Sequence, residues 1–170
     1  SFFQVNTMQA KKLYDTAASY LKDNGEERII DAFSGTGSIA LYLAEQAEKI
    51  FAVESLDSAV EDAKENAKLN NINNVEFKLG LVEEKLPEIL KKEDIDTIIF
   101  DPPRKGLDQK TVNLLLENEI KKIIYISCNP ATQARDLKSL KEKYQLIEIQ
   151  AVDLFPQTYH IESVALLKLK

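Results

Sequence analysis

The sequence predicts an α/β protein built around one doubly wound sheet. Two observations predict this fold class. Short runs rich in β-branched residues alternate with segments of helical periodicity along the whole chain, and the last two such runs follow each other with no room for a helix between them. Alternation of this kind gives parallel strands joined by right-handed crossovers, with helices on both faces. We therefore expect seven strands, five of them parallel, closed by a C-terminal antiparallel pair.

The first half of the chain predicts a leading helix and then strand and helix in alternation. Residues 7–21 carry apolar side chains at helical spacing, and Asn6 or Thr7 can cap that helix. The later elements follow from apolar runs of period two and amphipathic segments of period 3.6. In chain order they are strand 28–32, helix 38–46, strand 50–54, helix 58–69 and strand 75–79.

The second half continues the same pattern and then closes the sheet. The expected elements are helix 83–90, strand 95–100, helix 109–117, strand 122–127 and helix 132–143, followed by strands 144–154 and 162–169. The Lys- and Glu-rich stretches fall on the solvent faces of these helices. Neither a repeat nor a flexible linker divides the chain, so we expect one domain over residues 1–170.

Composition narrows the classes of function. The chain has 170 residues, one cysteine and one histidine, which excludes an internal disulfide and argues against a metal centre. Its net charge of −6 has the wrong sign for a protein that grips nucleic acid mainly by neutralising phosphates. No apolar run is long enough for a membrane span and no signal peptide is visible, so we expect a cytoplasmic protein without membrane contact. The missing initial Met suggests a piece of a longer chain.

A Gly-rich turn follows the first expected strand. Gly35 and Gly37 allow a tight turn and close approach of a ligand, and Glu54 at the next strand end can accept both hydroxyls of an adenosine ribose. The Gly-rich motif alone does not distinguish NAD from S-adenosylmethionine. A Gly-rich turn that binds no ligand is the alternative. Asp31 ahead of the turn favours S-adenosylmethionine, because Asp-x-Phe-x-Gly-x-Gly is a methyltransferase pattern.

Two further clusters follow the fourth and fifth expected strands. In Asp101-Pro102-Pro103-Arg104 the prolines stiffen the backbone and hold Asp101 and Arg104 in place, although an ordinary Pro-rich turn is the simpler alternative. Cys128 stands at a strand end just before Asn129 and a helix start. A lone cysteine is most often a buried, inert residue. A helix N-terminus lowers the pKa of a thiol, however, and Thr132 and Gln133 stand near enough to donate hydrogen bonds, which predicts a nucleophile.

The last cluster lies in the loop before the final strand. His160 is interpreted as a structural residue, because a single histidine is more often that than a catalyst. Glu162 opens a strand whose following residues are apolar. A carboxyl at the lip of a buried strand should have a raised pKa, which suits proton abstraction.

Taken together, these motifs resemble the S-adenosylmethionine-dependent RNA uracil-5 methyltransferases, in particular the catalytic domain of the branch that acts on 23S ribosomal RNA. The resemblance covers nearly the whole chain, with five motifs in the family's order: 1–6, 31–37, 101–106, 127–132 and 160–162. It implies a Rossmann-like class I methyltransferase sheet, S-adenosyl-L-methionine as cofactor and RNA as partner, without an obligate protein partner. A transfer-RNA enzyme of the same family is the alternative substrate class.

The resemblance also implies roles for single residues. Cys128 is the implied nucleophile and Glu162 the general base. The implied cofactor-binding residues are Gln4, Phe33, Gly35, Gly37, Ser38, Glu54 and Asp101, with Ser38 standing where relatives often have Asn. Arg104 and Asn129 are the implied substrate-binding residues. Beyond the resemblance, Phe155 and Tyr159 are candidates for stacking on the target base, and a packing role in the core suits Phe155 at least as well.

The acidic charge fits this family only if most RNA affinity lies elsewhere. Family members carry an N-terminal RNA-binding module and a central domain, and we expect those parts to supply it, helped by a basic rim at Arg104, Lys105, Lys110, Arg135 and Lys138. Three other hypotheses stay open: an amino-directed methyltransferase, which would leave Cys128 idle; an NAD-binding or non-catalytic module; and a fragment that binds cofactor without turnover.

Overall fold

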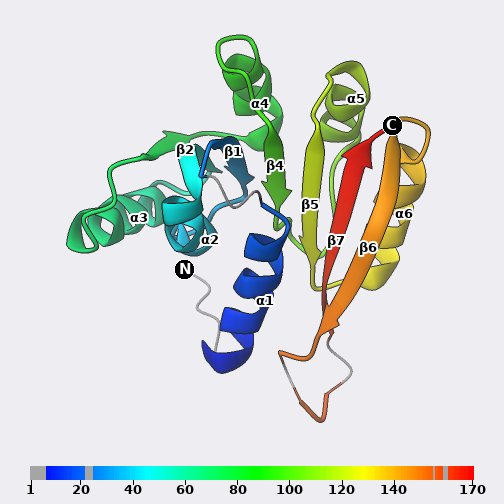
Figure 1. The fold of residues 1–170 in the computed structure, drawn as a ribbon, viewed down its shortest axis with the longest axis horizontal. Helices are drawn as coiled ribbons and strands as arrows, with labels where there is room; N and C mark the ends of the chain where they lie inside the picture. Colours follow the sequence, from blue (N-terminus) through cyan, green and yellow to red (C-terminus); the bar gives the residue numbers. More distant parts are fainter. Residues whose placement is uncertain (1–6, 22–24, 155, 159–160) are drawn as a thin grey trace.

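The computed structural model describes residues 7–21, 25–154, 156–158 and 161–170. Its centre is a seven-stranded sheet with the order β3-β2-β1-β4-β5-β7-β6 (Figure 1). The strands are β1 (Glu27–Ala32), β2 (Ala47–Glu54), β3 (Val75–Leu79), β4 (Thr97–Phe100), β5 (Lys122–Ser127), β6 (Tyr144–Val152) and β7 (Glu162–Leu169). The five leading strands pair in parallel and β7 pairs antiparallel with both β5 and β6. The predicted fold class is confirmed.

The helices lie where the sequence predicted them, with shifts at their ends. They are α1 (Thr7–Ser19), α2 (Ser38–Leu43), α3 (Asp57–Leu69), α4 (Val82–Leu90), α5 (Gln109–Glu117) and α6 (Pro130–Leu140), and a 3₁₀ turn η1 (Ala44–Gln46) follows α2. Helix α6 starts earlier than predicted, because the Asn129 side chain accepts a hydrogen bond from the Ala131 N–H and Pro130 suits the first turn. Strand β4 begins at Thr97 instead of residue 95.

Two apolar layers hold the helices onto the sheet. On one face, residues of α1 and α2 such as Leu13 and Leu43 pack against Ile29, Ile50 and Ile124. On the other face, α4, α5 and α6 cover a second cluster that includes the fully buried rings of Phe100 and Tyr125. Both faces of the central strands are therefore buried, which explains why these strands read as continuous apolar runs.

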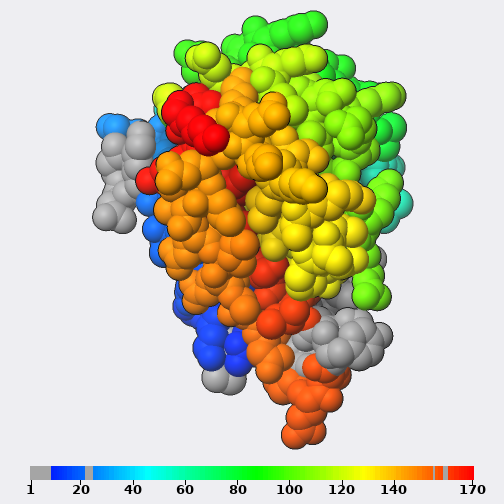
Figure 2. Space-filling view, turned by 90° about the vertical axis from the view of Figure 1, so that its right-hand side faces the viewer, coloured from blue at the N-terminus to red at the C-terminus, as the bar shows by residue number. Residues whose placement is uncertain are grey.

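The sheet has an open edge at β6. All seven residues between Tyr144 and Val152 are exposed, and Figure 2 shows this strand in orange beside α6 in yellow. Among the described residues, no helix is long and apolar enough to cross a membrane.

A buried ion pair ties α1 to the amino ends of three strands. Lys122 Nζ donates to Glu27 Oε1 (2.6 Å) and to the Tyr20 carbonyl (2.6 Å), and Thr97 Oγ1 donates to Glu27 Oε2 (2.5 Å). The charges of this pair are satisfied where water is excluded, so loss of either partner would leave an unpaired buried charge. The polar motifs lie at the opposite edge of the sheet, where the strands have their carboxyl ends. Helix α1 extends toward that edge (Figure 1).

Candidate active site

The Gly-rich turn between β1 and α2 is held in a strained conformation. Phe33, Gly35 and Gly37 all have positive φ angles of 66°, 53° and 78°. Phe33 is a bulky residue in the left-handed region, which is costly unless the surroundings enforce it. A side chain at Gly37 would come within 3.0 Å of Phe77, whereas one at Gly35 would meet nothing within 4 Å. Gly37 is therefore required for packing, and Gly35 faces open space.

Glu54 links this turn to the end of β2. Its Oε2 accepts a hydrogen bond from the Gly35 N–H (2.9 Å), and its Oε1 accepts from the N–H groups of Ser55 (2.7 Å) and Leu56 (2.8 Å). The carboxylate is half-buried and fixed from both sides. Its Oε2 therefore lies beside Gly35, and its role in binding a ribose stays a prediction.

Asp31 lies beneath the Gly-rich turn, and one of its two carboxyl oxygens has no hydrogen-bond partner. Its Oδ2 accepts from the Ala40 N–H (3.1 Å), but Oδ1 is buried without a hydrogen-bond partner, as is the hydroxyl of Ser34. Burial, together with Asp101, raises the pKa of Asp31 to about 8. Buried polar atoms without a hydrogen-bond partner are costly, and these two lie directly beneath the Gly-rich turn.

Asp101 connects the two halves of the site. It follows β4, its N–H points to the Ala32 carbonyl (3.4 Å), and burial of its carboxyl raises its pKa to about 7. The Asp101 charge also raises the pKa values of Asp31, Glu162 and Cys128, so all three lie within its electrostatic range. The fold therefore brings a predicted cofactor-binding residue between the two predicted catalytic residues and the Gly-rich turn.

Cys128 and Glu162 are held by neighbouring strands. Ser127 of β5 pairs with Ser163 of β7, and Cys128 and Glu162 are the next residues beyond that pair. The Ser163 hydroxyl donates to the Gln133 side chain (2.8 Å) and reaches the Ser127 carbonyl (3.3 Å), which fixes both strand ends. Cys128 is partly exposed, and Glu162 is 6% exposed. Burial, and then Asp101, raises the pKa of Glu162 to about 7, as the sequence predicted.

The expected pKa of the thiol was wrong in its direction. Burial raises the pKa of Cys128, and the carboxyls of Glu162 and Asp101 raise it further, whereas Arg104 and a backbone hydrogen bond lower it. Two facing carboxyls and burial therefore outweigh the helix N-terminus on which the prediction relied. Arg104 is the nearby cation that favours the thiolate.

The polar side chains that follow Cys128 donate hydrogen bonds to backbone carbonyls and not to the thiol. The Asn129 side chain donates to the Arg104 carbonyl (3.1 Å), and the Thr132 hydroxyl donates to that same carbonyl (3.1 Å). Gln133 donates to the Tyr125 carbonyl (2.9 Å). The expectation that Thr132 and Gln133 hydrogen-bond the thiol is thus not met. Asn129 ties the Cys128 and Arg104 loops together, and its contact with substrate stays a prediction.

Sequence reasoning missed an apolar rim at the ends of β2 and β3. The Gly80 N–H donates to the Glu54 carbonyl (2.9 Å), which places the residues after the two strands side by side. Leu56, Leu79 and Leu81 in these segments are exposed by 53%, 46% and 46%. Large apolar side chains left in water beside a polar site suit a flat ring. Their sequence signal, apolar residues directly after strands, is too common to have identified them.

The remaining residues that the sequence predicted for the site are partly described by the structure and partly outside the described residues. Ser38 opens α2 and is exposed, with its hydroxyl 3.4 Å from that of Thr36. Gln4, Phe155, Tyr159 and His160 lie outside the described residues. Within the described ranges, no group of three or more His, Cys, Asp or Glu side chains could hold a metal ion. Of the predicted basic rim, Arg135 is bound to Asp136 and to the Lys105 and Leu107 carbonyls.

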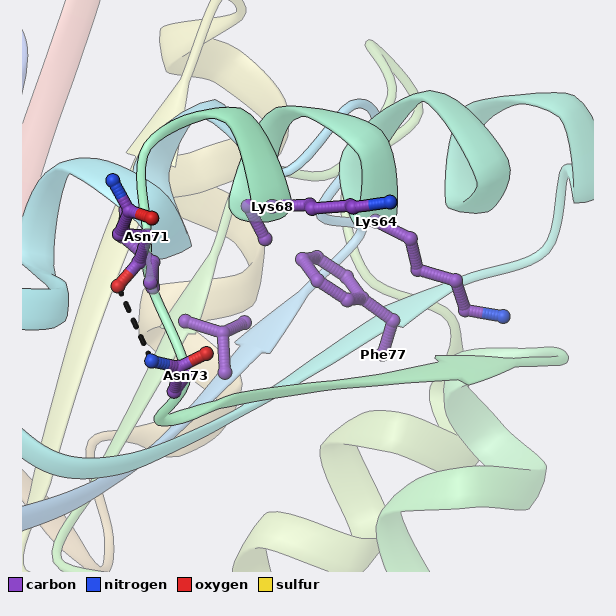
Figure 3. Close-up of a pocket in the computed structure, with 8 residues that line it drawn as sticks. Lys64, Lys68, Asn71, Asn73 and Phe77 are labelled. Atoms are coloured by element: carbon purple, nitrogen blue, oxygen red, sulfur yellow. Dashed lines mark hydrogen bonds between the residues drawn. The ribbon is translucent and has the colours of Figure 1, made fainter.

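A separate hollow lies between α3 and β3 (Figure 3). It measures about 400 Å³, and the Phe77 ring points into it from β3 beneath Lys64 and Lys68 of α3. Its other polar residues, Asn71 and Asn73, precede β3, so the hollow lies toward the amino end of that strand. None of the predicted site residues lines it, and we assign it no function.

The comparisons with known proteins agree with this geometry. The family model described as tRNA (Uracil-5-)-methyltransferase matches residues 1–170. The chain is 49% identical over 172 residues to an uncharacterized RNA methyltransferase of Fusobacterium nucleatum and 50% identical over 171 residues to one of Bacillus cereus. These alignments cover 100% and 99% of the chain but 37% of each relative, so the chain spans little more than a third of their length.

A solved structure extends the likeness to three dimensions. It is the tRNA (uracil-54, C5)-methyltransferase of Pyrococcus abyssi in complex with S-adenosyl-L-homocysteine, with a TM-score of 0.86 and 37% identity. The match covers 98% of this chain and 40% of that one. An rRNA methylase of Streptococcus thermophilus, at 16% identity and a TM-score of 0.72, shares the fold.

Proposed function

The chain belongs to the tRNA (Uracil-5-)-methyltransferase family, and from this premise we propose that it transfers a methyl group from S-adenosyl-L-methionine to carbon 5 of a uridine in RNA. The observation that carries the proposal is the position of Cys128 and Glu162, each one residue beyond the last β5–β7 pair, Ser127–Ser163, and within the electrostatic range of Asp101. A thiol and a protonatable carboxyl at one strand end are the two groups that this chemistry needs. Residues 1–170 form the catalytic domain in this proposal.

The turn region fits S-adenosyl-L-methionine. Glu54 would hold the ribose hydroxyls, and the space in front of Gly35 would take the cofactor's chain. The apolar rim of Leu56 and Leu81 suits its adenine ring. When bound, the cofactor supplies an electrophilic methyl group.

The chain's own residues make carbon 5 reactive. Carbon 5 of uracil is too weak a nucleophile alone, so the Cys128 thiolate adds to carbon 6, and the electron pair of the carbon 5–carbon 6 double bond moves toward carbon 5 and oxygen 4. Donors at the uracil edge stabilise that charge, and Arg104 and protonated Asp101 are the candidates among the described residues. Carbon 5 would then bond to the methyl group of the cofactor as the methyl–sulfur bond breaks, and S-adenosylhomocysteine would leave.

Glu162 completes the cycle. Its carboxylate removes the proton from carbon 5, the double bond forms again, and the bond between carbon 6 and Sγ of Cys128 breaks, which returns the thiolate. A pKa of about 7 suits a base at neutral pH, because a substantial fraction is ionised while the group still binds a proton well. The target base must leave its stack to reach Cys128.

Ribosomal RNA is the proposed substrate, from the motifs that resemble the 23S branch, and the cytoplasm is the proposed compartment. Transfer RNA is the second candidate, because the family description and the Pyrococcus abyssi neighbour both name tRNA enzymes. Mass mapping of 5-methyluridine in RNA from cells with and without the gene tests this directly. Loss of a 5-methyluridine from 23S rRNA supports the first candidate, loss from tRNA supports the second, and no loss in either contradicts the proposed activity.

A further inference from the structure

The loop that connects β4 to α5 is fastened to the first turns of α6. This loop contains no helix or strand, and it carries Asp101 and Arg104 of the candidate active site. The Arg104 carbonyl accepts hydrogen bonds from the side chains of Asn129 and Thr132, each at 3.1 Å. Because Asn129 directly follows Cys128, the backbone of Arg104 is bound to the neighbour of the predicted nucleophile.

Arg135 of α6 holds the next part of the same loop. Its guanidinium donates to the carbonyls of Lys105 (2.9 Å) and Leu107 (3.2 Å). The same group pairs with Asp136 Oδ1, from Nε at 2.9 Å and from Nη2 at 2.7 Å. The sequence predicted Arg135 as part of a basic rim for RNA, but these contacts direct its Nε and Nη2 donors toward the protein itself. The planar fork of an arginine suits several fixed acceptors at once.

Asp136 is the buried partner that fixes Arg135. It is 2% exposed, and its Oδ2 accepts hydrogen bonds from the Tyr125 hydroxyl (2.7 Å) and from the Leu107 N–H (2.8 Å). Both carboxyl oxygens are therefore occupied, one by Arg135 and the other by β5 and the loop. A buried polar network whose members are all satisfied is rigid, so Arg135 is held in one orientation.

Gly106 shows how closely the loop approaches the helix. It has a φ angle of 76°, and a side chain there would come within 2.5 Å of Asp136 Oδ2 and 2.8 Å of Arg135 Nη2. A residue without Cβ is what lets the loop backbone lie against both groups. The loop conformation and the Arg135–Asp136 pair therefore depend on each other.

We propose that Arg135, held by Asp136, is a positioning residue that fixes the loop after β4, so that Arg104 stays next to Cys128 at the start of α6. The inference rests on the proposed function, in which Arg104 stabilises the uracil edge while Cys128 attacks the ring. The lowering of the pKa of Cys128 by Arg104 agrees with this proximity. Arg135 thus takes part in the reaction through Arg104 and without contact with RNA.

Alkylation of Cys128 by iodoacetamide tests this assignment without RNA or cofactor, because the chain has one cysteine. Arg104→Ala should slow alkylation at pH 7.5 about threefold, since loss of a nearby cation leaves less thiolate. Arg135→Ala should slow it similarly, and Arg104→Ala/Arg135→Ala should be no slower than Arg104→Ala alone. Lys138→Ala removes an exposed cation from the same helix and is the matched control, with no change expected.

Arg135→Lys distinguishes the position of Arg135 from its charge. It keeps a cation beside the buried Asp136, but one ammonium group does not reproduce the fork that bonds Asp136 and both carbonyls, so alkylation should be slowed as in Arg135→Ala. Circular dichroism measures whether each variant is folded. If Arg135→Ala unfolds, Arg135→Lys decides the test.

Each other outcome overturns the assignment. A normal rate in Arg104→Ala would show that Arg104 does not act on the thiol, and a normal rate in Arg135→Lys would show that only the charge of Arg135 matters. Additive slowing in the double variant would show that Arg135 acts on Cys128 independently of Arg104. Because alkylation needs no turnover, these outcomes stay separate from the mass mapping of 5-methyluridine that tests the proposed function.

Discussion

Cys128 and Glu162 stand opposite each other, one residue beyond the last antiparallel pair of β5 and β7, and the Glu162 carboxyl raises the pKa of the Cys128 thiol. The thiol and the carboxyl are thus coupled before any substrate is present. An ionised Glu162 disfavours the thiolate, and a protonated Glu162 relieves that repulsion. The same two groups are those that the proposed reaction uses in succession.

Replacement of the nucleophile separates binding from chemistry. Cys128→Ala should abolish methyl transfer to uridine and change the affinity for S-adenosylhomocysteine less than about twofold, because in the proposed reaction the thiol contacts the base and not the cofactor. Radiolabel transfer and calorimetry measure the two effects. Methylation of uridine by the variant would show that Cys128 is not the nucleophile.

Replacement of the base should arrest the reaction midway. Glu162→Gln removes the group that takes the carbon 5 proton, so the bond between Cys128 and carbon 6 persists and a protein–RNA species appears on a denaturing gel. The double variant Cys128→Ala/Glu162→Gln is the control and should give none. A Glu162→Gln enzyme without the adduct would remove Glu162 from this role.

The reactivity of the thiol should follow its raised pKa. The chain has one cysteine, so alkylation by iodoacetamide reports on Cys128 alone. At pH 7.5 the rate should be lower than that of an unstructured cysteine peptide, since less thiolate is present, and Glu162→Gln should increase it by removing a facing negative charge. A rate above that of the peptide would contradict the electrostatics described here.

The pH dependence of stability should reveal Asp31. Its folded pKa of about 8 exceeds the ordinary value near 3.9, so the folded state binds the proton more tightly. The stabilisation is complete below about pH 4 and is lost as the pH rises toward 8. The side chain in Asp31→Asn cannot ionise. Between pH 5 and pH 8.5 the free energy of unfolding of this variant should therefore fall less than that of the unmodified chain, by a difference of the order of 3 kcal/mol, measured by urea unfolding.

The exposed Asp15 provides the control for that measurement. Its pKa is lowered by hydrogen bonds to Tyr42 and Lys11, so it is ionised in both states across this range. Asp15→Asn should therefore keep the pH slope of the unmodified chain. A parallel slope for Asp31→Asn would mean that Asp31 ionises normally.

The open space at Gly35 can be tested against a second glycine of the same backbone type. Gly35→Ala and Gly25→Ala both place a side chain at positive φ, 53° and 67°, and neither meets a neighbour closer than 4.0 Å. Each should cost about 1 kcal/mol of stability. Only Gly35→Ala should weaken S-adenosylhomocysteine, by about tenfold or more, because its methyl group occupies the ligand's space. Equal affinities would place the cofactor elsewhere.

The sequence predicted what lies on a single strand or turn. Periodicity located every strand, and polar residues after strands indicated the site edge, because carboxyl ends of parallel strands meet. Glu162 was predicted to have a raised pKa because its burial follows from the apolar strand that it opens.

Properties that depend on several distant segments were not predictable in this way. The pKa of Cys128 is raised by burial and then by Glu162 and Asp101, which belong to other segments of the fold, so the local sequence does not reveal these influences. The apolar rim that includes Leu56 and Leu81 forms only when β2 and β3 pair, so the sequence alone does not reveal it.

The central claim is methyl transfer to carbon 5, and release of the hydrogen at that carbon tests it most directly. RNA prepared with tritium at carbon 5 of uridine would be incubated with the chain and S-adenosyl-L-methionine. We expect tritium in water in proportion to the methyl groups incorporated, and none with Cys128→Ala. Methyl incorporation without tritium release would place the methyl group on another atom and contradict the account.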